Sequence, residues 1–326
     1  MKILVFGATG YVGSHATRRL ISAGHEVTGF VRSDEGVQRM KDLGAHSVQG
    51  SLDDLPAVLP MLSGYDAIVW ATQLMIPVEY RVVSAMLDAL QGSGKTFICT
   101  TGTGLLAQRT DGEWSEDTFA EDEPFTPSRY IGARVETEKL VREAASRGIR
   151  TMVLRPPLIW GNGGSKVIAD LHLSAAKTGA VCYIGRGLNL YSHVHVEDLA
   201  ELYVLALERG VSGALYHSVA GEVNFRCIAE TIARHLGVGT RSIGFAEAEQ
   251  LWDKFTALIM FSSCSRTRSP RARRELGWQP HPDRVDILEE AVSPAYRQVP
   301  QTRKPASWVA PAGTASITTG SQSAQS

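Results

Sequence analysis

Three glycines spaced three residues apart, Gly7, Gly10 and Gly13, follow a short apolar run and precede a helical pattern. A turn at such a place needs positive φ or a close backbone approach, which a residue without Cβ tolerates best. The N–H groups at the start of the following helix, with its positive dipole end, hold phosphate groups. Between a strand and a helix, this spacing predicts a dinucleotide pyrophosphate site rather than a plain tight turn.

The end of the second apolar run discriminates between two cofactors. An acidic side chain there would bind the ribose 2′-hydroxyl of NAD, but residues 30–33 read FVRS and the first carboxylate comes at Asp34. Arg32 follows Gly13 by 32 − 13 = 19 residues, close to the roughly 20 expected of the ribose-reading position. A guanidinium there binds a 2′-phosphate through charge-assisted hydrogen bonds. NADP(H) is therefore favoured over NAD(H), the alternative being an ordinary surface arginine.

Alternating strand and helix patterns are the elements that must position these residues. Apolar runs at 2–6, 26–31, 46–48, 67–71 and 97–100 predict buried strands, and stretches at 12–23, 35–43, 55–62 and 78–90 predict the helices between them. Continuous apolar strands alternating with helices indicate a parallel sheet covered on both faces. Right-handed crossovers then make it a doubly wound Rossmann sheet in an α/β protein.

In the second half of the chain, predicted strands and helices no longer alternate regularly. Further strands are predicted at 151–155, 193–196 and 215–219, and further helices at 130–146, 198–208, 225–236 and 246–258. We expect a dinucleotide-binding domain from residues 1–160 with 188–222, and a smaller C-terminal substrate-binding lobe from 161–187 with 223–300. Residues 301–326 contain no acid and few large apolar side chains, so a disordered tail is predicted there.

Composition excludes several classes of protein. The 326 residues carry 33 Lys+Arg against 34 Asp+Glu, a net charge of −1, which argues against a binder of nucleic acid or anionic membranes. The sequence has no apolar run near the ~18 residues of a membrane span and no CxxC pair. His193 and His195 have no visible third ligand, so no metal is predicted. We expect a cytoplasmic protein with a small-molecule substrate, for which a homodimer is allowed.

Two charged stretches flank the predicted site in sequence. Acidic residues gather between Asp111 and Glu123, ahead of Tyr130, which makes this stretch a candidate lid as well as a solvated loop. Arginines at 266, 268, 271, 273 and 274 form the densest basic run. Without interleaved aromatic residues, a solvated helix or one arginine that reaches an anionic substrate is favoured over a nucleic-acid surface.

Five segments occur together in one order. They are GATGYVG at 7–13, a tyrosine-initiated helix after the fifth strand, LRPPLIWG at 154–161, HVHVEDLA at 193–200 and ARRELGWQP at 272–280. Together they resemble the extended short-chain dehydrogenase/reductase family, the NAD(P)-dependent epimerase/dehydratase group. The resemblance spans nearly the whole chain, from Met1 to about Arg297.

The resemblance implies a catalytic Tyr-x-x-x-Lys helix and a Ser or Thr at the preceding strand end. Tyr130 and Arg134 occupy the helix positions, four apart and so expected on one face, and Thr101 and Thr103 both remain candidates for the substrate-oriented hydroxyl. In the family the lysine binds the nicotinamide ribose and lowers the tyrosine pKa, so that tyrosine relays a proton to or from a carbinol oxygen. Arg134 departs from this pattern: it can bind ribose and favour tyrosinate, but it releases no proton and is larger than an ammonium.

The resemblance also implies the remaining contacts. Cofactor contacts are expected from the glycine turn, the strand ends and the catalytic helix: Gly7, Thr9, Gly10, Tyr11, Val12, Gly13, Arg32, Ser51, Leu52, Ala71, Thr72, Tyr130, Arg134, Pro156, Leu158 and Ile159. Substrate contacts are expected from the lobe: Asn162, Lys166, Tyr183, Arg186 and Tyr191.

The sequence thus predicts an NADP(H)-dependent oxidoreductase that acts on a carbonyl or carbinol of a small polar or cyclic substrate. The same parts also serve a sugar-nucleotide epimerase or dehydratase that returns the hydride to its substrate. Arginine in the lysine position keeps a third alternative open, a protein that senses NADP(H) without turnover and regulates a partner.

Overall fold

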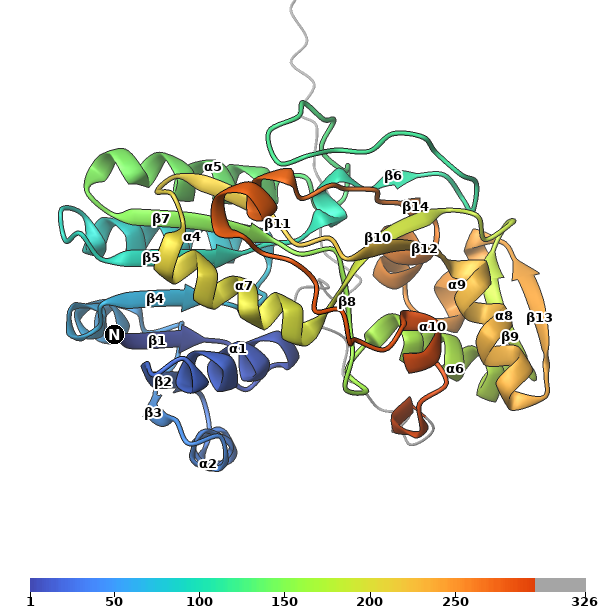
Figure 1. Ribbon diagram of the computed structural model, residues 1–326, viewed down its shortest axis with the longest axis horizontal. Coiled ribbons are helices and arrows are strands. Elements are labelled where there is room, and N and C mark those ends of the chain that lie inside the picture. The colour runs from blue at the N-terminus through green and yellow to red at the C-terminus, as the bar shows by residue number, and fades with distance from the viewer. Residues whose placement is uncertain (297–326) are drawn as a thin grey trace, which may run out of the picture.

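A computed structural model describes residues 1–296 and is built around one seven-stranded sheet (Figure 1). The strands are β1 (Lys2–Phe6), β2 (Glu26–Val31), β3 (His46–Gln49), β4 (Ala67–Trp70), β5 (Thr96–Thr100), β7 (Arg150–Arg155) and β11 (Ala214–His217). They lie in the order β11-β7-β5-β4-β1-β2-β3, and all pair in parallel. The predicted doubly wound Rossmann sheet is confirmed. The strand order reverses between β1 and β4, where such sheets open a crevice for a dinucleotide.

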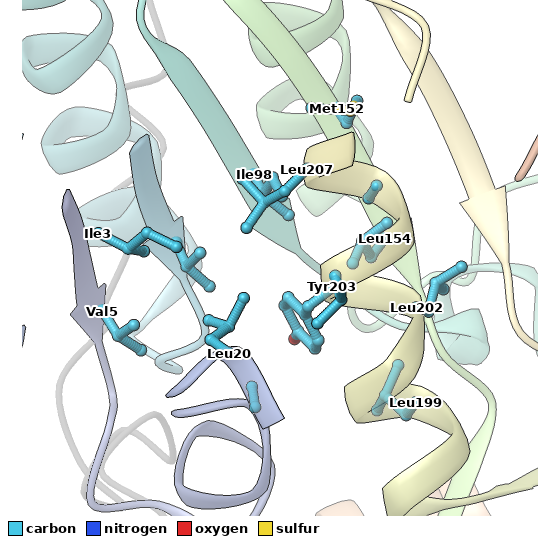
Figure 2. Close-up of a cluster of buried hydrophobic side chains, with 14 of the residues drawn as sticks. Ile3, Val5, Leu20, Ile98, Met152, Leu154, Leu199, Leu202, Tyr203 and Leu207 are labelled. Carbon is cyan, nitrogen blue, oxygen red and sulfur yellow. The ribbon is translucent and has the colours of Figure 1, made fainter. Parts of the chain in front are cut away.

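Helices cover both faces of this sheet. On one face lie α1 (Tyr11–Ser22), α2 (Asp34–Asp42) and α7 (Val196–Arg209); on the other lie α3 (Leu55–Val58), η1 (Leu59–Gly64), α4 (Ile76–Leu90), α5 (Arg134–Glu143) and η3 (Ala144–Arg147). Figure 2 shows the first face, where Leu199, Tyr203 and Leu207 of α7 belong to one buried cluster with Ile98 of β5 and Leu154 of β7. The Tyr203 hydroxyl lies 2.6 Å from Thr100 Oγ1, so this core reaches the carboxyl end of β5.

A smaller lobe stands beside the carboxyl edge of the sheet (Figure 1). It contains the three-stranded sheet β12-β10-β8 and the pair β13-β9, with α6, α8 and α9 packed around its own core. The bounds are β8 (Leu158–Trp160), α6 (Lys166–Thr178), β9 (Ala180–Ile184), β10 (Leu190–His195), β12 (Gly221–Asn224), α8 (Phe225–Leu236), β13 (Gly239–Ile243), α9 (Phe245–Leu251), η4 (Thr256–Phe261), α10 (Ile287–Glu290) and η6 (Pro294–Tyr296). The turn η5 (Ala272–Leu276) instead packs against α7 in the core of the large sheet. The division into domains stays a prediction, and the tail at 301–326 lies outside the described residues.

Two predicted helices are wrong in their extent. The helix predicted at 246–258 ends at Leu251, because Asp253 accepts the backbone N–H of Thr256 at 2.8 Å and begins a separate turn. The helix predicted at 130–146 begins only at Arg134. Before it, the backbone N–H of Gly132 donates to Ser128 O at 2.7 Å, and a Cβ at Gly132 would lie 2.3 Å from that oxygen. This tight turn delays the helix, so Tyr130 and Arg134 do not share a helix face.

Candidate functional site

The glycine turn between β1 and α1 is closed by backbone contacts that exclude side chains. Gly7 has φ +84°, and a Cβ there would lie 2.5 Å from Ala71 O at the end of β4. A Cβ at Gly13 would lie 2.0 Å from Gly7 O, whereas one at Gly10 would lie 3.2 Å from the same oxygen. The turn therefore sits at the crevice between β1 and β4. The start of α1 points its N–H groups into that crevice, as a pyrophosphate site requires.

Other residues expected at the cofactor follow the neighbouring strands at the same edge of the sheet. Arg32 is exposed directly after β2, and Ser33 beside it caps α2 by accepting the Gly36 N–H at 3.3 Å. Ser51 comes shortly after β3, and its hydroxyl donates to Asp53 at 3.2 Å. Thr9 lies within the glycine turn, Val12 in α1, Leu52 after Ser51 and Thr72 after Ala71. The ends of β1, β2 and β3 lie side by side, so the structure brings the glycine turn, Arg32 and Ser51 to one edge.

Tyr11 connects the glycine turn to the loop after β8. Its hydroxyl donates to Gly161 O at 2.6 Å, and a Cβ at Gly164 would lie 2.0 Å from its ring. Burial raises the pKa of Tyr11 well above its ordinary value, so the side chain stays a neutral donor. Asn162, expected at the substrate, instead donates to Glu197 at 2.9 Å beside the first turn of α7. This loop therefore belongs to the wall of the crevice next to α1.

Arg134 is held by a carboxylate that the sequence analysis did not identify. Its Nε and Nη2 donate to the two carboxylate oxygens of Glu79 at 2.7 Å each, and Nη2 also donates to Thr100 O at 3.1 Å. The two side chains are 13% and 1% exposed. Burial lowers the pKa of Arg134, but the adjacent Glu79 carboxylate outweighs it and raises the pKa overall. The positive charge in the lysine position is therefore compensated within the protein.

A signal for Glu79 was present in the sequence. The helix α4 buries Val82, Val83, Met86 and Leu90, and Glu79 stands on this apolar face at helical spacing. A lone carboxylate on a buried face needs a buried cation or hydrogen-bond donors. Glu79 lies in the first turn of α4, just after β4. A cation that pairs with it is therefore expected near the carboxyl ends of the strands.

Tyr130 lies in the turn that precedes α5 and is 45% exposed. The neighbouring Ser128 N–H donates to Leu105 O at 2.8 Å, which places this turn against residues 103–106 after β5. Hydrogen bonds to Asp111 and to the Tyr130 hydroxyl raise the pKa of Arg109, although its partial burial opposes them. The cation beside the Tyr130 hydroxyl is therefore Arg109 and not the predicted Arg134.

The two candidate threonines at the end of β5 belong to different networks. Thr101 donates to Glu138 at 2.5 Å, and Glu138 is paired with the buried Arg155. Thr103 O and Oγ1 both lie near the Ser265 hydroxyl, which donates to them at 3.0 and 3.3 Å. Ser265 is also hydrogen-bonded to the buried Tyr191 hydroxyl, and burial raises the pKa of Tyr191 well above its ordinary value. The structure thus brings Thr103 and the predicted substrate residue Tyr191 together.

The remaining predicted residues lie in the smaller lobe or in the loop that leads to it. Pro156 O accepts the Thr103 N–H at 3.0 Å, and Leu158 and Ile159 form β8 behind it. Lys166 donates to Asp170 and Thr256 at 2.5 and 2.8 Å. Tyr183 in β9 lies under the Arg226 guanidinium, 5.8 Å from the ring centroid. Arg186 donates to Glu113 at 3.3 Å. Lys166 and Arg186 are therefore neutralised by carboxylates of the protein itself.

The acidic stretch and the basic run contact each other through ion pairs and hydrogen bonds. Arg268 pairs with Glu123 and Arg271 with Asp122, while the buried Glu121 accepts the backbone N–H of Arg271 at 3.1 Å. Two backbone hydrogen bonds join Phe119 to residues 266 and 268, and β6 (Gln108–Arg109) pairs with β14 (Ser263–Cys264). The segment 108–123 is thus docked along 262–271 by charge and by backbone pairing.

Two further properties bear on the kind of site. In the part of the chain that the structure covers, no helix combines the length and apolar character needed to cross a membrane. Within residues 1–296, no group of three His, Cys, Asp or Glu side chains is arranged to hold a metal ion. His193 accepts the Trp160 indole N–H at 3.0 Å, and His195 accepts the Glu197 backbone N–H at 3.2 Å. Both histidines therefore have structural partners.

Known proteins are similar in sequence to this chain over most of its length. The model of the NAD dependent epimerase/dehydratase family matches residues 3–219. An uncharacterised protein of Schizosaccharomyces pombe is 32% identical over 307 residues, which is 91% of this chain and 100% of that protein. The 4-hydroxy-2-methyl-3-oxo-4-farnesyl-3,4-dihydroquinoline-1-oxide ketoreductase of Stigmatella aurantiaca is 26% identical, covering 89% of this chain and 96% of its own.

Solved structures show the same fold at lower identity. The dTDP-glucose 4,6-dehydratase DesIV from Streptomyces venezuelae, with NAD and TYD bound, superimposes with a TM-score of 0.71 at 18% identity. The match covers 91% of this chain and 96% of that one. It is a likeness of fold, and it includes both the large sheet and the smaller lobe.

Proposed function

Because the chain belongs to the NAD-dependent epimerase/dehydratase family, we propose that it is an NADP(H)-dependent oxidoreductase acting on a carbonyl or carbinol of a small uncharged substrate. The family comprises epimerases and dehydratases, the Stigmatella relative is a ketoreductase, and the chain is an NAD(P)-dependent enzyme of this kind. The observation that carries the proposal is the glycine turn, where backbone atoms occupy the space of any Cβ at Gly7 and Gly13. The residues present therefore fit a dinucleotide pyrophosphate at the start of α1.

The preference for NADP(H) rests on Arg32, which is exposed after β2 at the ribose-reading position. We expect Arg32→Ala to weaken NADPH binding about ten- to a hundredfold, since a charge-assisted hydrogen bond contributes about 1.5–3 kcal/mol, and to leave NADH binding unchanged. Calorimetric titration of both cofactors measures this. Arg39→Ala is the matched control, because Arg39 lies on the adjacent α2 and pairs with Glu35. Equal losses for the two cofactors would contradict the preference.

The charges around the lobe favour an uncharged substrate over a sugar nucleotide. A diphosphate needs unpaired cations, but Lys166 contacts Asp170 and Asp253, and Arg186 contacts Glu113. Arg266, the first of the basic run, donates to Glu222 and to backbone oxygens of the docked segment. A diphosphate would have to displace these carboxylates. A neutral ketone can bind without displacing them. The Stigmatella relative is a ketoreductase whose named substrate has a hydroxyl next to its oxo group.

In the proposed reaction, the bound nicotinamide supplies or receives the hydride, and the residues of this chain manage the oxygen and its proton. Tyr130 is the proton donor to the carbonyl oxygen, with Arg109 as the cation beside its hydroxyl. Thr101 and Thr103 follow the end of β5 and are the candidate hydroxyls that orient the substrate. Arg134 keeps its place under the strand ends and, compensated by Glu79, supports the ribose side of the site without adding net charge.

The role of Tyr130 is tested by Tyr130→Phe. We expect kcat for NADPH-dependent ketone reduction to fall about a hundredfold, as for loss of a general acid, with NADPH affinity unchanged. Stopped-flow absorbance of NADPH measures the hydride step directly. Tyr80→Phe is the control, since Tyr80 is similarly exposed on α4. Turnover that survives Tyr130→Phe at the wild-type rate would remove Tyr130 from the mechanism.

A further inference from the structure

Four polar residues form one buried chain that ends on the Thr101 hydroxyl. Thr101, Glu138, Arg155 and His217 are 7%, 2%, 3% and 0% exposed. Thr101 contacts Glu138 at 2.5 Å, and Arg155 contacts Glu138 through Nε at 3.0 Å and also through Nη2. Arg155 Nη1 lies 3.3 Å from His217 Nε2, and His217 Nδ1 lies 2.9 Å from Arg268 O. These residues come from the end of β5, from α5 and from the ends of β7 and β11.

The direction of every hydrogen bond in this chain follows from its chemistry. A backbone carbonyl only accepts, so His217 Nδ1 must carry the hydrogen that faces Arg268 O. Burial and, to a lesser extent, the nearby Arg155 lower the pKa of His217 to about 3, so the ring is neutral and Nε2 keeps its lone pair. That lone pair accepts a hydrogen from Arg155.

The direction continues to Thr101. A guanidinium only donates, so Arg155 donates to both oxygens of Glu138. The ionised carboxylate of Glu138 only accepts, so the single hydroxyl hydrogen of Thr101 must point to Glu138. The other side of Thr101 Oγ1 therefore carries lone pairs, and Thr101 directly follows β5 at the carboxyl edge of the large sheet. This hydroxyl acts there as a hydrogen-bond acceptor.

We propose that Glu138 is a positioning residue that holds the Thr101 hydroxyl as an acceptor, and that the substrate is a ketone or aldehyde with a hydroxyl group next to the carbonyl. An acceptor repels a carbonyl oxygen, which offers only lone pairs, whereas it binds a neighbouring hydroxyl hydrogen. The carbonyl oxygen must then take its proton from a different group, and in the proposed reaction that group is Tyr130. The inference rests on the proposed function and goes beyond it by naming the substrate class.

The variant Glu138→Gln distinguishes positioning from a purely structural role. A glutamine must turn its carbonyl oxygen toward Arg155, because an amide N–H facing a guanidinium would leave two donors opposed. Its amide nitrogen then donates to Thr101, whose own hydrogen is released toward the crevice. Thr101 becomes a donor there, and the preference between substrates should reverse.

The experiment compares matched pairs of ketones, acetoin with butanone and benzoin with deoxybenzoin, by NADPH oxidation. We expect the wild type to prefer the hydroxy ketone about tenfold or more in kcat/KM, the size of one hydrogen bond left unmade in a buried site. Thr101→Val should remove this preference by slowing only the hydroxy ketone, and Thr101→Ser should restore it. Glu138→Gln should favour the simple ketone. Glu136→Gln is the control, because Glu136 is exposed on the same helix.

Each outcome bears on one of the two proposals. Equal efficiency of the wild type on both members of each pair, or equal losses on both in Thr101→Val, would overturn the substrate class and leave the oxidoreductase proposal standing. An absence of NADPH oxidation with every carbonyl would overturn the proposed function and this inference with it. If Glu138→Gln does not fold, the near-isosteric Thr101→Val and Thr101→Ser variants decide the matter.

Discussion

Gly13→Ala is expected to abolish NADPH binding at concentrations that saturate the wild type. The added Cβ would lie 2.0 Å from Gly7 O and 2.7 Å from Gly7 C. These are backbone atoms of the phosphate-binding turn itself, so they cannot turn aside as a flexible side chain would. The start of α1 must then move away from the turn, and the phosphate contacts are lost together. We expect the Kd for NADPH to rise at least about a hundredfold, the equivalent of one or two charge-assisted hydrogen bonds.

Fluorescence titration with NADPH measures this change, and thermal unfolding of the free protein shows whether the variant is folded. Gly64→Ala is the matched control, because nothing lies within 4 Å of a Cβ built at Gly64. This variant should bind NADPH like the wild type. A Gly13→Ala protein with wild-type affinity would show that the cofactor does not use this turn.

Glu79→Ala is expected to destabilise the protein by about 3–5 kcal/mol, the usual cost of leaving one member of a buried ion pair alone. Arg134 would keep its charge beneath the strand ends with only Thr100 O among its present partners. A loss of this size is a large part of the stability of a typical domain. Urea unfolding followed by tryptophan fluorescence measures it.

The double variant Glu79→Leu with Arg134→Met distinguishes the charge interaction of the two residues from the packing of their side chains. Replacing both partners by apolar residues of similar size removes the unpaired charge, so much of the lost stability should return. If Glu79→Ala unfolds at the wild-type urea concentration, the Glu79–Arg134 pair does not stabilise the fold.

Elements with strong local patterns could be predicted from the sequence. The central strands of the large sheet are short apolar runs, and β1 and β2 have the bounds predicted for them. The edge strand β3 is the exception, since its residues HSVQ are mostly exposed and not buried as predicted. The glycine turn was also predictable, since its spacing and its place between a strand and a helix are both local.

The rest depends on contacts between distant parts of the chain. Glu79 and Arg134 are 55 residues apart, and the pairing of 108–123 with 262–271 spans about half the chain. The sequence showed an acidic stretch and a basic run, but charge alone does not say that they meet. The start of α5 depends on the turn at Gly132, which is packed against Pro127 and Ser128. A helical pattern that continues to Tyr130 does not reveal this crowding.

The site differs from the pattern that the resemblance implies in how its charges are arranged. The cation in the lysine position is neutralised by Glu79, and the cation beside the Tyr130 hydroxyl is Arg109, held by Asp111. The strand-end hydroxyl of Thr101 is committed to Glu138. These pairings leave the entrance to the lobe without the excess positive charge that a diphosphate requires. They suit a substrate recognised by hydrogen bonds.

One measurement tests the central proposal most directly. The purified protein is given NADPH or NADH with neutral ketones and aldehydes in one series and with UDP- and dTDP-sugars in another. Cofactor absorbance and product analysis are followed together. The proposal predicts net oxidation of NADPH with at least one neutral carbonyl, at a kcat/KM about tenfold or more above that with NADH. Interconversion of a sugar nucleotide without net cofactor turnover, or tight NADPH binding without turnover of any substrate, would contradict it.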